Sequence, residues 1–252
     1  MLVPTFFIGK LNYCFSNINN VLKNVRNLFN RLNIRLILDM DKVKLVVESI
    51  IGGGKTTVTD YLAKEFNLKY FKEDPDIPLL KKFYASQKAY ALPLQYNLLA
   101  RRSILEKNSD DELRNNYSIY NGVILDRALI FDKAFARVLT QNESIGRDDL
   151  KIFENEIDVA LMNFKKYDKV IYLDVTPQKA DERQKKRARE MELKASTDFT
   201  KGTNSILPYL VQLSKEYKGL LEEIRKDYDV MVFDLNDEGM IPKLKTSLEK
   251  IL

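Results

Sequence analysis

The run Gly52-Gly53-Gly54-Lys55-Thr56-Thr57 constrains this sequence more than any other feature. It follows a β-rich run, residues 43–47, and opens a segment, residues 56–66, with the pattern of a helix. Glycines let successive backbone N–H groups converge on phosphate oxygens, and a helix N-terminus adds its positive end. In such a loop the lysine reaches the β- and γ-phosphates, and the hydroxyl of Thr56 is offered to Mg²⁺. The run therefore predicts a phosphate loop formed by Gly52, Gly53, Gly54, Lys55, Thr56 and Thr57.

One position departs from the phosphate-loop pattern G-x-x-x-x-G-K-[ST]. Ser49 stands where the pattern has its first glycine. Glycine at that position usually permits a tight turn. The alternative interpretation is a glycine-rich turn between a strand and a helix, with Lys55 in solvent. The position of the run between a strand and a helix favours nucleotide binding.

The rest of the chain alternates between the patterns of strands and helices. Further strands are predicted at 122–125, 169–174 and 229–233. Helices are predicted at 79–106, 128–140, 147–166, from 177, near 206–226 and from 242. Strands separated by long helices indicate an α/β fold, in which helices cover both faces of a parallel sheet. No repeat, low-complexity tract or linker interrupts the chain after residue 40, so we expect one domain there.

Composition excludes several classes of site. The sequence of 252 residues has no histidine, which rules out Ser-His-Asp triads and His-ligated zinc. Cys14 is the single cysteine, so internal disulfides and cysteine metal clusters are excluded. A reducing intracellular compartment fits this, and we expect a cytoplasmic protein. The net charge of +5 suits phosphorylated ligands but is too small to indicate nucleic-acid binding, and no apolar stretch is long enough to span a membrane.

The first 38 residues differ from the rest, because they carry five basic and no acidic side chains. A targeting segment would explain this composition, although serine is scarce and no small-residue cleavage site follows the apolar run. An extra helix packed on the domain is a second interpretation. A third is that Met40 is the natural start and an over-long gene assignment added the preceding residues. We expect residues 1–39 to be an extension outside the catalytic fold, and residues 40–252 to form the domain.

From about residue 43 to 252, several segments in the correct order resemble the deoxynucleoside kinase family, above all its compact bacterial members. The first is Phe71-Lys72-Glu73-Asp74-Pro75, which is similar to the family's Glu-Pro segment although Asp74 intervenes. The resemblance implies that Glu73 is the general base for the 5′-hydroxyl of the substrate, with Asp74 as the fallback. Two solvated acids in a loop are the ordinary alternative.

Three residues in the predicted helix 79–106 match the family's sugar and base contacts. The resemblance implies that Tyr84 holds the sugar 3′-hydroxyl, and that Gln95 and Arg102 bind the base edge. Gln95 and Arg102 are seven residues apart and so lie on one face of a helix. An amide with a paired donor and acceptor suits a nucleobase edge. A surface amide and a surface arginine are the alternative.

The segment Leu125-Asp126-Arg127-Ala128 resembles the family's acidic-Arg-Ser motif, with alanine in place of serine. The resemblance implies that Asp126 contributes to the Mg²⁺ shell and that Arg127 lies between Glu73 and the reacting phosphate. Asp132 follows at the family's interval and would accompany Arg102 at the base. A structural ion pair at the end of a strand is the alternative.

The segment Arg187-Ala188-Arg189 resembles the basic lid that closes over ATP phosphates in this family. Glu192 matches a family glutamate that joins Tyr84 at the sugar. Such a basic run is equally typical of a solvated helix face. With the lid, the resemblance implies a P-loop kinase fold: a parallel sheet flanked by helices, with a short basic lid.

The expected reaction is transfer of a phosphoryl group from ATP or another nucleoside triphosphate, with Mg²⁺, to the 5′-hydroxyl of a deoxynucleoside in nucleotide salvage. In the resembled family an arginine and an aspartate at the positions of Arg102 and Asp132 accompany deoxyadenosine, deoxycytidine or deoxyguanosine as substrates. Deoxyadenosine is favoured among the three because the chain most resembles small bacterial adenosine-type members. A thymidylate kinase is one alternative. A catalytically impaired partner subunit, marked by Ser49 and Ala128, is another. The resemblance implies a homodimer, and we expect neither nucleic acid nor membrane as a partner.

Overall fold

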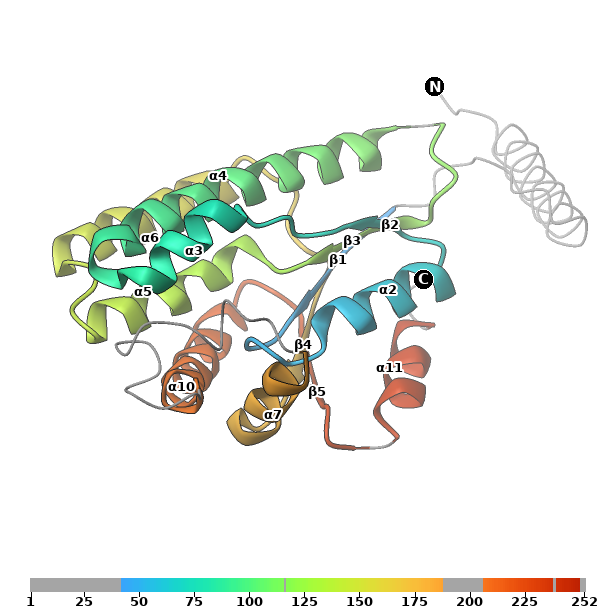
Figure 1. Cartoon of the computed structure of the whole chain (residues 1–252). Coiled ribbons are helices and arrows are strands. Elements are labelled where there is room, and N and C mark those ends of the chain that lie inside the picture. Colours follow the sequence, from blue (N-terminus) through green and yellow to red (C-terminus); the bar gives the residue numbers. More distant parts are fainter. Residues whose placement is uncertain (1–41, 116, 188–205, 238, 250–252) are drawn as a thin grey trace, which may run out of the picture. The chain divides into compact units, whose positions relative to one another are not determined.

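The computed structural model describes residues 42–115, 117–187, 206–237 and 239–249. Within these ranges, five strands form one sheet in the order β2-β3-β1-β4-β5, and every neighbouring pair is parallel (Figure 1). The strands are β1 (Val43–Glu48), β2 (Lys69–Phe71), β3 (Gly122–Asp126), β4 (Lys169–Asp174) and β5 (Val230–Asp234). The predicted α/β fold with a parallel sheet is confirmed.

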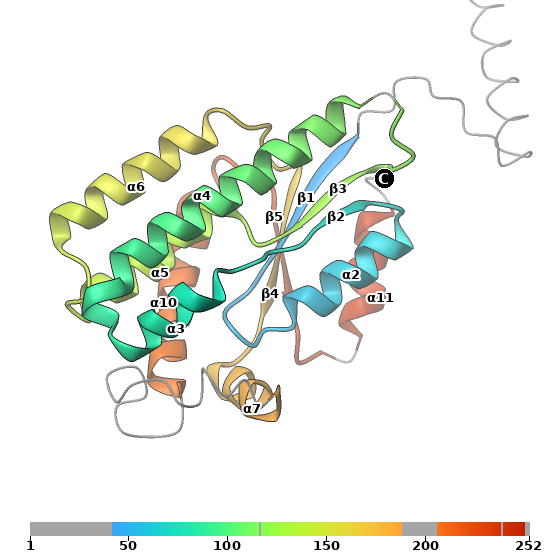
Figure 2. The ribbon, with the colours of Figure 1, turned by 45° about the horizontal axis from the view of Figure 1, so that its top comes forward.

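Helices cover both faces of the sheet, which explains why β1 and β3 are almost continuously buried. Val46, Val123 and Val170 pack into the larger core, whose helices are α4 (Gln87–Arg114), α5 (Asp132–Gln141), α6 (Arg147–Leu161) and α10 (Leu207–Ile224). Leu45 and Ile124 face the smaller core, beneath α2 (Lys55–Glu65) and α11 (Met240–Leu248). Figure 2 shows these two layers on opposite sides of the strands.

Two elements differ from the sequence prediction. The edge strand β2 was not predicted, because it has three residues and all of them are only half-buried. The predicted single helix 79–106 is wrong, because the chain forms two helices there, α3 (Ile77–Ala85) and α4. They are separated at Ser86, which has an extended backbone with φ −155° and ψ 91°. Apolar residues continue at helical spacing on both sides of Ser86, so the pattern concealed the break.

The remaining boundaries shift by a few residues. The predicted helix 128–140 begins as a 3₁₀ turn, η1 (Leu129–Phe131), before α5, and α6 ends at Leu161 instead of residue 166. α7 (Pro177–Arg187) follows β4. No helix in the described ranges has the length and apolar character needed to span a bilayer.

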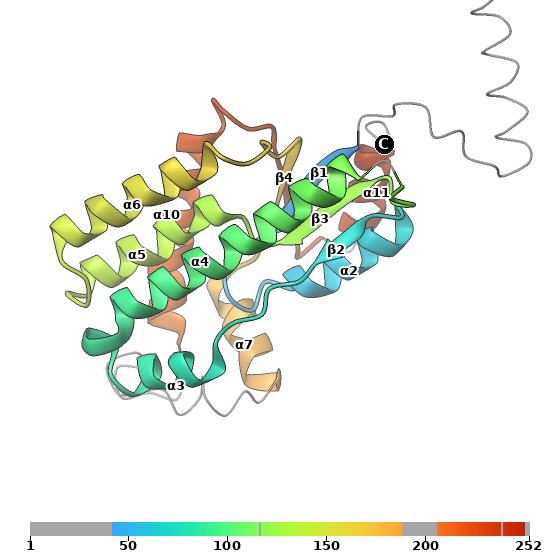
Figure 3. The ribbon, with the colours of Figure 1, turned by 90° about the horizontal axis from the view of Figure 1, so that it is seen from above.

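All five strands run in one direction, so their carboxyl ends lie at the same edge of the sheet (Figure 3). The phosphate loop follows β1, Glu73 follows β2, and Asp126 ends β3. Register places Val47 of β1 opposite Asp126 of β3. The parallel topology thus gathers residues that are far apart in sequence at one place.

Candidate active site

The loop after β1 is built around glycine backbone conformations and close approaches. Gly52 and Gly54 have φ values of 83° and 77°, in the left-handed region that side chains disfavour. A Cβ at Gly52 would lie 2.5 Å from the carbonyl oxygen of Ala180 in α7, so even a methyl group would not fit. Gly54 caps the N-terminus of α2, where backbone N–H groups and the helix dipole favour an anion.

Ser49 replaces the expected glycine without strain. The described non-glycine residues with positive φ are Asn67, Arg127 and Glu143, so the backbone at Ser49 does not require glycine. Its buried hydroxyl donates a hydrogen bond of 2.7 Å to the carbonyl oxygen of Leu173 in β4. A Cβ at Gly53 would lie 1.8 Å from that hydroxyl. Ser49 therefore fills the space beside Gly53 and ties the loop to the sheet.

Lys55 is buried beneath the loop. Its ammonium group donates to the carbonyl oxygens of Ser49, at 2.8 Å, and Ile50, at 3.2 Å. Burial, followed by the positive charge of Arg127, lowers the pKa of Lys55 to about 8, although Glu48 opposes the shift. A phosphate placed in the loop would favour the charged form and raise this pKa again.

One carboxylate oxygen of Asp126 accepts hydrogen bonds from two hydroxyl groups. Thr56 donates to its Oδ2 at 2.7 Å, and Tyr70 of β2 donates to the same atom at 3.1 Å. Its Oδ1 is buried and has no hydrogen-bond partner in the described structure. Carboxylate and hydroxyl oxygens are the ligand type that Mg²⁺ prefers. The described residues contain no group of three or more His, Cys, Asp or Glu that could hold a metal.

Glu73 lies between two arginines. Its Oε2 accepts a hydrogen bond of 2.8 Å from Nε of Arg127, and its Oε1 forms an ion pair with Arg102. Burial alone raises the pKa of Glu73, but the two guanidinium groups together outweigh it and hold the pKa well below its usual range. The side chain is 20% exposed, whereas that of Asp74 is 93% exposed. The carboxylate at the centre of this cluster is therefore that of Glu73.

A second cavity opens beside Glu73, between α3, α4 and α10. Tyr84, Gln95 and Arg102 line it together with apolar side chains, among them Leu80, Phe83 and Leu98. Arg102 forms a buried ion pair with Asp132 at the start of α5. Oε1 of Gln95 is buried and has no hydrogen-bond partner in the described part of the chain. Apolar walls with a few placed polar groups are typical of a small-molecule site.

The phosphate loop and this second cavity share three lining residues, Ile51, Glu73 and Arg127. Glu73 and Arg127 are the charged ones. A molecule bound in the second cavity would therefore present its end to the phosphate loop at the point where a carboxylate and a guanidinium face each other. The fold and this arrangement define a P-loop phosphotransferase that acts on a small molecule.

Comparison with known proteins identifies the family. A family model described as deoxynucleoside kinase matches residues 45–252. The chain is 31% identical to the deoxyadenosine kinase of Dictyostelium discoideum over 193 residues, which are 74% of this chain and 70% of that protein. It is 26% identical to the deoxyadenosine/deoxycytidine kinase of Bacillus subtilis over 212 residues, which are 82% of this chain and 92% of that protein.

Solved structures agree at the level of the fold. The structure of deoxyadenosine kinase from M. mycoides with bound dCTP matches with a TM-score of 0.67 and 23% identity, and covers 82% of this chain and 100% of that chain. The chain belongs to the deoxynucleoside kinase family. It is an enzyme that phosphorylates a deoxynucleoside, and the thymidylate kinase interpretation is set aside.

Several predicted residues remain untested by the structure. Arg189 and Glu192 lie outside the described residues, and of Arg187, the last residue of α7, only the backbone is described. The basic lid therefore stays a prediction. Sequence reasoning missed Glu48, Tyr70 and Tyr217. An acid at the end of an apolar strand was a signal for Glu48, whereas nothing in the sequence distinguishes Tyr217 from other core tyrosines.

Proposed function

We propose that the enzyme transfers the γ-phosphoryl group of ATP, with Mg²⁺, to the 5′-hydroxyl of deoxyadenosine, with deoxycytidine and deoxyguanosine as secondary substrates. The observation that carries this proposal is the junction of the two cavities at Glu73 and Arg127. A nucleoside in the second cavity would place its 5′-hydroxyl beside Glu73, within reach of a phosphate held by the loop.

The roles of the residues follow from their surroundings. Glu73 is ionised and can accept a hydrogen bond from the 5′-hydroxyl and take its proton as the new bond forms. Arg127 and Lys55 lie on the phosphate side, where positive charge stabilises the transferring group. We expect Tyr84 to bind the sugar and Gln95 to bind the base edge, because both line the nucleoside cavity.

Thr56 and Asp126 would hold the Mg²⁺ ion together with phosphate oxygens. The unpartnered Oδ1 of Asp126 fits this assignment, since a buried carboxylate oxygen requires a partner. The bound ion would neutralise charge on the β- and γ-phosphates. Thr56 and Tyr70 keep the carboxylate of Asp126 in one orientation through their hydrogen bonds to Oδ2.

The base preference rests on the pair formed by Arg102 and Asp132. Both side chains are buried; Arg102 lines the nucleoside cavity, and Asp132 reaches it through its ion pair with Arg102. The 5-methyl group of thymine needs apolar room, and a charged pair beside it would be left desolvated without partners. The names of the two relatives above, deoxyadenosine kinase and deoxyadenosine/deoxycytidine kinase, support the same preference.

Purified protein with ATP, Mg²⁺ and each of the four deoxynucleosides tests the proposal. We expect product with deoxyadenosine and at least about 10⁴-fold lower kcat/KM with thymidine. No product with any deoxynucleoside would favour an impaired nucleotide-binding subunit.

A double variant tests the pair itself. Arg102→Met combined with Asp132→Ala should admit thymidine and weaken phosphorylation of deoxyadenosine. Arg101→Met is the matched control, because Arg101 is the adjacent arginine, pairs with Asp74 and Asp76, and does not line the cavity. Equal rates with thymidine and deoxyadenosine in the unmodified enzyme would refute the preference.

A homodimer and a cytoplasmic location are the remaining parts of the proposal. The family resemblance suggests the dimer, and exposed apolar residues on the neighbouring helices α4 and α6 support it, namely Ile104, Ile152 and Val159. Light scattering should give a dimer for the unmodified protein and a monomer for Ile152→Glu. The location is supported by the single cysteine and stays a prediction.

A further inference from the structure

Glu48, the last residue of β1, is a carboxylate with no exposed surface, directly behind the phosphate loop. Its Oε1 accepts hydrogen bonds from the backbone N–H of Ser49, at 2.8 Å, and from the hydroxyl of Tyr217, at 3.2 Å. Its Oε2 accepts from the backbone N–H of Ala128 at 3.1 Å. A buried charge is tolerated only when such partners compensate for lost hydration.

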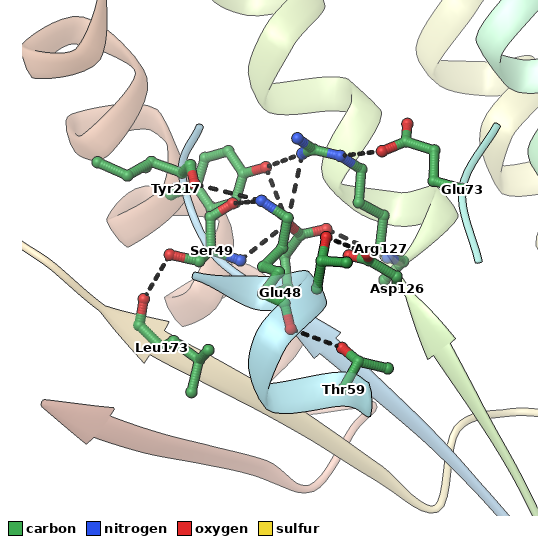
Figure 4. Close-up of polar contacts among 12 residues, drawn as sticks. Glu48, Ser49, Thr59, Glu73, Asp126, Arg127, Leu173 and Tyr217 are labelled. Atoms are coloured by element: carbon green, nitrogen blue, oxygen red, sulfur yellow. Dashed lines mark hydrogen bonds and ion pairs between the residues drawn. The ribbon is translucent and has the colours of Figure 1, made fainter. Parts of the chain in front are cut away.

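The same carboxylate reaches Arg127 by two routes. Nη1 of Arg127 lies 3.5 Å from Oε1 of Glu48, and it also donates to the hydroxyl of Tyr217 at 3.3 Å. The Tyr217 hydroxyl thus accepts from Arg127 and donates to Glu48. Figure 4 shows Glu48 and Tyr217 on one side of the guanidinium and Glu73 on the other. Burial and then the charge of Glu48 raise the pKa of Tyr217, which keeps the hydroxyl protonated and able to donate.

The backbone at Arg127 also needs support. Its φ of 90° is rare for a residue with a side chain and carries strain. The N–H of Arg127 donates to the carbonyl oxygen of Val47 at 3.1 Å, and the next N–H, that of Ala128, donates to Glu48. The end of β1 therefore holds this turn on both sides, which explains how an unfavourable conformation persists.

We infer that Glu48 and Tyr217 are positioning residues: they hold the Arg127 guanidinium where it faces both the phosphate loop and Glu73. The inference deepens the proposed function and rests on it. Arg127 has two carboxylate partners on opposite sides, Glu73 in the cavity wall and Glu48 behind it. Without Glu48, the guanidinium of Arg127 would pair with Glu73 alone. It would then move away from the position in which it reaches a phosphate.

Removing one hydroxyl tests this arrangement. Tyr217→Phe keeps the ring, which packs against Phe131, Phe135 and Tyr172. It deletes the hydroxyl that bridges Arg127 and Glu48 and leaves the direct contact of 3.5 Å between them. We expect kcat to fall about tenfold, because a hydrogen bond to a charged group is lost, while KM for both substrates changes by less than about twofold. Tyr172→Phe is the matched control, since this tyrosine lies in the same cluster and the described structure shows no hydrogen bond from it to Glu48 or Arg127.

A double-mutant cycle separates positioning from a merely structural role. If Tyr217 acts through Arg127, Tyr217→Phe should change kcat by less than about twofold in an Arg127→Lys background. A second tenfold loss in that background would mean that the two residues act independently, and would overturn the inference. Glu48→Gln provides a further variant, with an expected loss of about 100-fold in kcat and retained ATP binding.

An NMR measurement makes the outcome independent of activity. In the ligand-free enzyme, the Nε–H signal of Arg127 should exchange with water faster in Tyr217→Phe than in the unmodified protein and in Tyr172→Phe. Unchanged exchange would overturn the positioning role even if the enzyme is a deoxynucleoside kinase. Faster exchange in a protein that phosphorylates no deoxynucleoside would leave the positioning intact and refute only the proposed function.

Discussion

β1 carries a buried ion network at each of its ends. Cavities reach the charged groups of one network and not those of the other. At the amino end, Lys44 has no exposed surface and pairs with Asp110 at 2.6 Å and Glu106 at 2.8 Å, both from α4. At the carboxyl end, Glu48 is equally buried and contacts Arg127 and Tyr217.

The amino-end network is closed, in the sense that no cavity described above reaches it. Lys44 also donates to the carbonyl oxygen of Lys165 at 3.0 Å, and the Tyr167 hydroxyl donates to Glu106. Burial raises the pKa of Glu106 despite the lysine beside it. None of these side chains lines the phosphate loop or the nucleoside cavity.

The carboxyl-end network is open, in the sense that its charged groups line cavities. Oδ1 of Asp126 and Oε1 of Gln95 lack hydrogen-bond partners within the described residues, and two cavities reach the charged groups. Charge and burial are similar at both ends of the strand, so they do not distinguish a structural cluster from a functional one. The cavities do, because Oε2 of Glu106 at the amino end also lacks a hydrogen bond, besides its ion pair with Lys44, but neither cavity reaches it.

The largest expected effect concerns the closed network. Lys44→Met leaves two buried carboxylates without their cation and should destabilise the fold by about 3–5 kcal/mol. The midpoint of thermal unfolding should fall on the order of 10 °C. Activity of the folded fraction should be unchanged, because Lys44 lies four residues, or about 13 Å of strand, from Glu48.

Lys64→Met is the control for this variant. Lys64 forms an exposed ion pair with Asp60, so its loss should cost less than about 1 kcal/mol. Calorimetry of unfolding and single-turnover kinetics measure the two quantities separately. A large loss of kcat in Lys44→Met with normal stability would remove the distinction between the two networks.

The next effect concerns the centre of the open network. Glu73→Gln keeps the shape and a hydrogen-bonding group but cannot take the hydroxyl proton, so kcat should fall about 100-fold or more. Calorimetric titration should show ATP affinity within about twofold of the unmodified enzyme. Asp74→Asn is the matched control, because that carboxylate is exposed and lines neither cavity. If Asp74→Asn is instead the inactive variant, the assignment of the base is off by one residue.

A smaller effect should appear in the number of protons that the enzyme takes up when it binds ATP. Burial lowers the pKa of Lys55 to about 8 in the ligand-free enzyme, so a fraction of the molecules carries a neutral Lys55 near pH 8. Bound phosphate raises the pKa, and ATP binding near pH 8 should therefore take up a fraction of a proton. At pH 6 the lysine is already charged, and its share of the uptake should vanish.

Calorimetry in buffers of different ionisation enthalpy measures this uptake. Lys55→Arg supplies the control, because a guanidinium does not titrate in this range. Equal uptake at pH 8 in the arginine variant would assign the proton to another group.

The last prediction is that removal of residues 1–39 has no effect on folding or activity. A chain that starts at Met40 retains both networks and the residues matched by the family model, 45–252. It should fold, bind ATP and phosphorylate deoxyadenosine like the full chain, as measured by circular dichroism and steady-state kinetics. Insoluble or inactive protein would show that residues 1–39 belong to the catalytic fold.

The sequence predicted the architecture because most strands and helices are long enough to show a period. It failed at β2, whose three half-buried residues give no pattern, and at Ser86, where two helices continue one apolar spacing. Local pattern carries information about burial but not about a single residue's backbone angles.

For the site, motif positions indicated which residues gather at the carboxyl edge, since a parallel sheet brings strand ends together. They did not indicate Tyr217, which is 169 residues from Glu48 in the sequence. The apolar strand around Lys44 and Glu48 shows that two charged residues are buried, but not what they contact, because their partners come from distant helices and loops. Buried ion networks depend on tertiary contacts, which a single sequence does not display.

Ser49 has a consequence for how such enzymes are found. A pattern search that demands glycine at the first position of the loop would pass over this chain, although the two glycines with positive φ, Gly52 and Gly54, are in place. In this chain the first position holds a serine that lies beside Gly53 without a positive φ, so glycine is not required there. A search that tests the backbone torsion angles and the space for a side chain at each loop position would retain sequences of this kind. A search for fixed residue types would not.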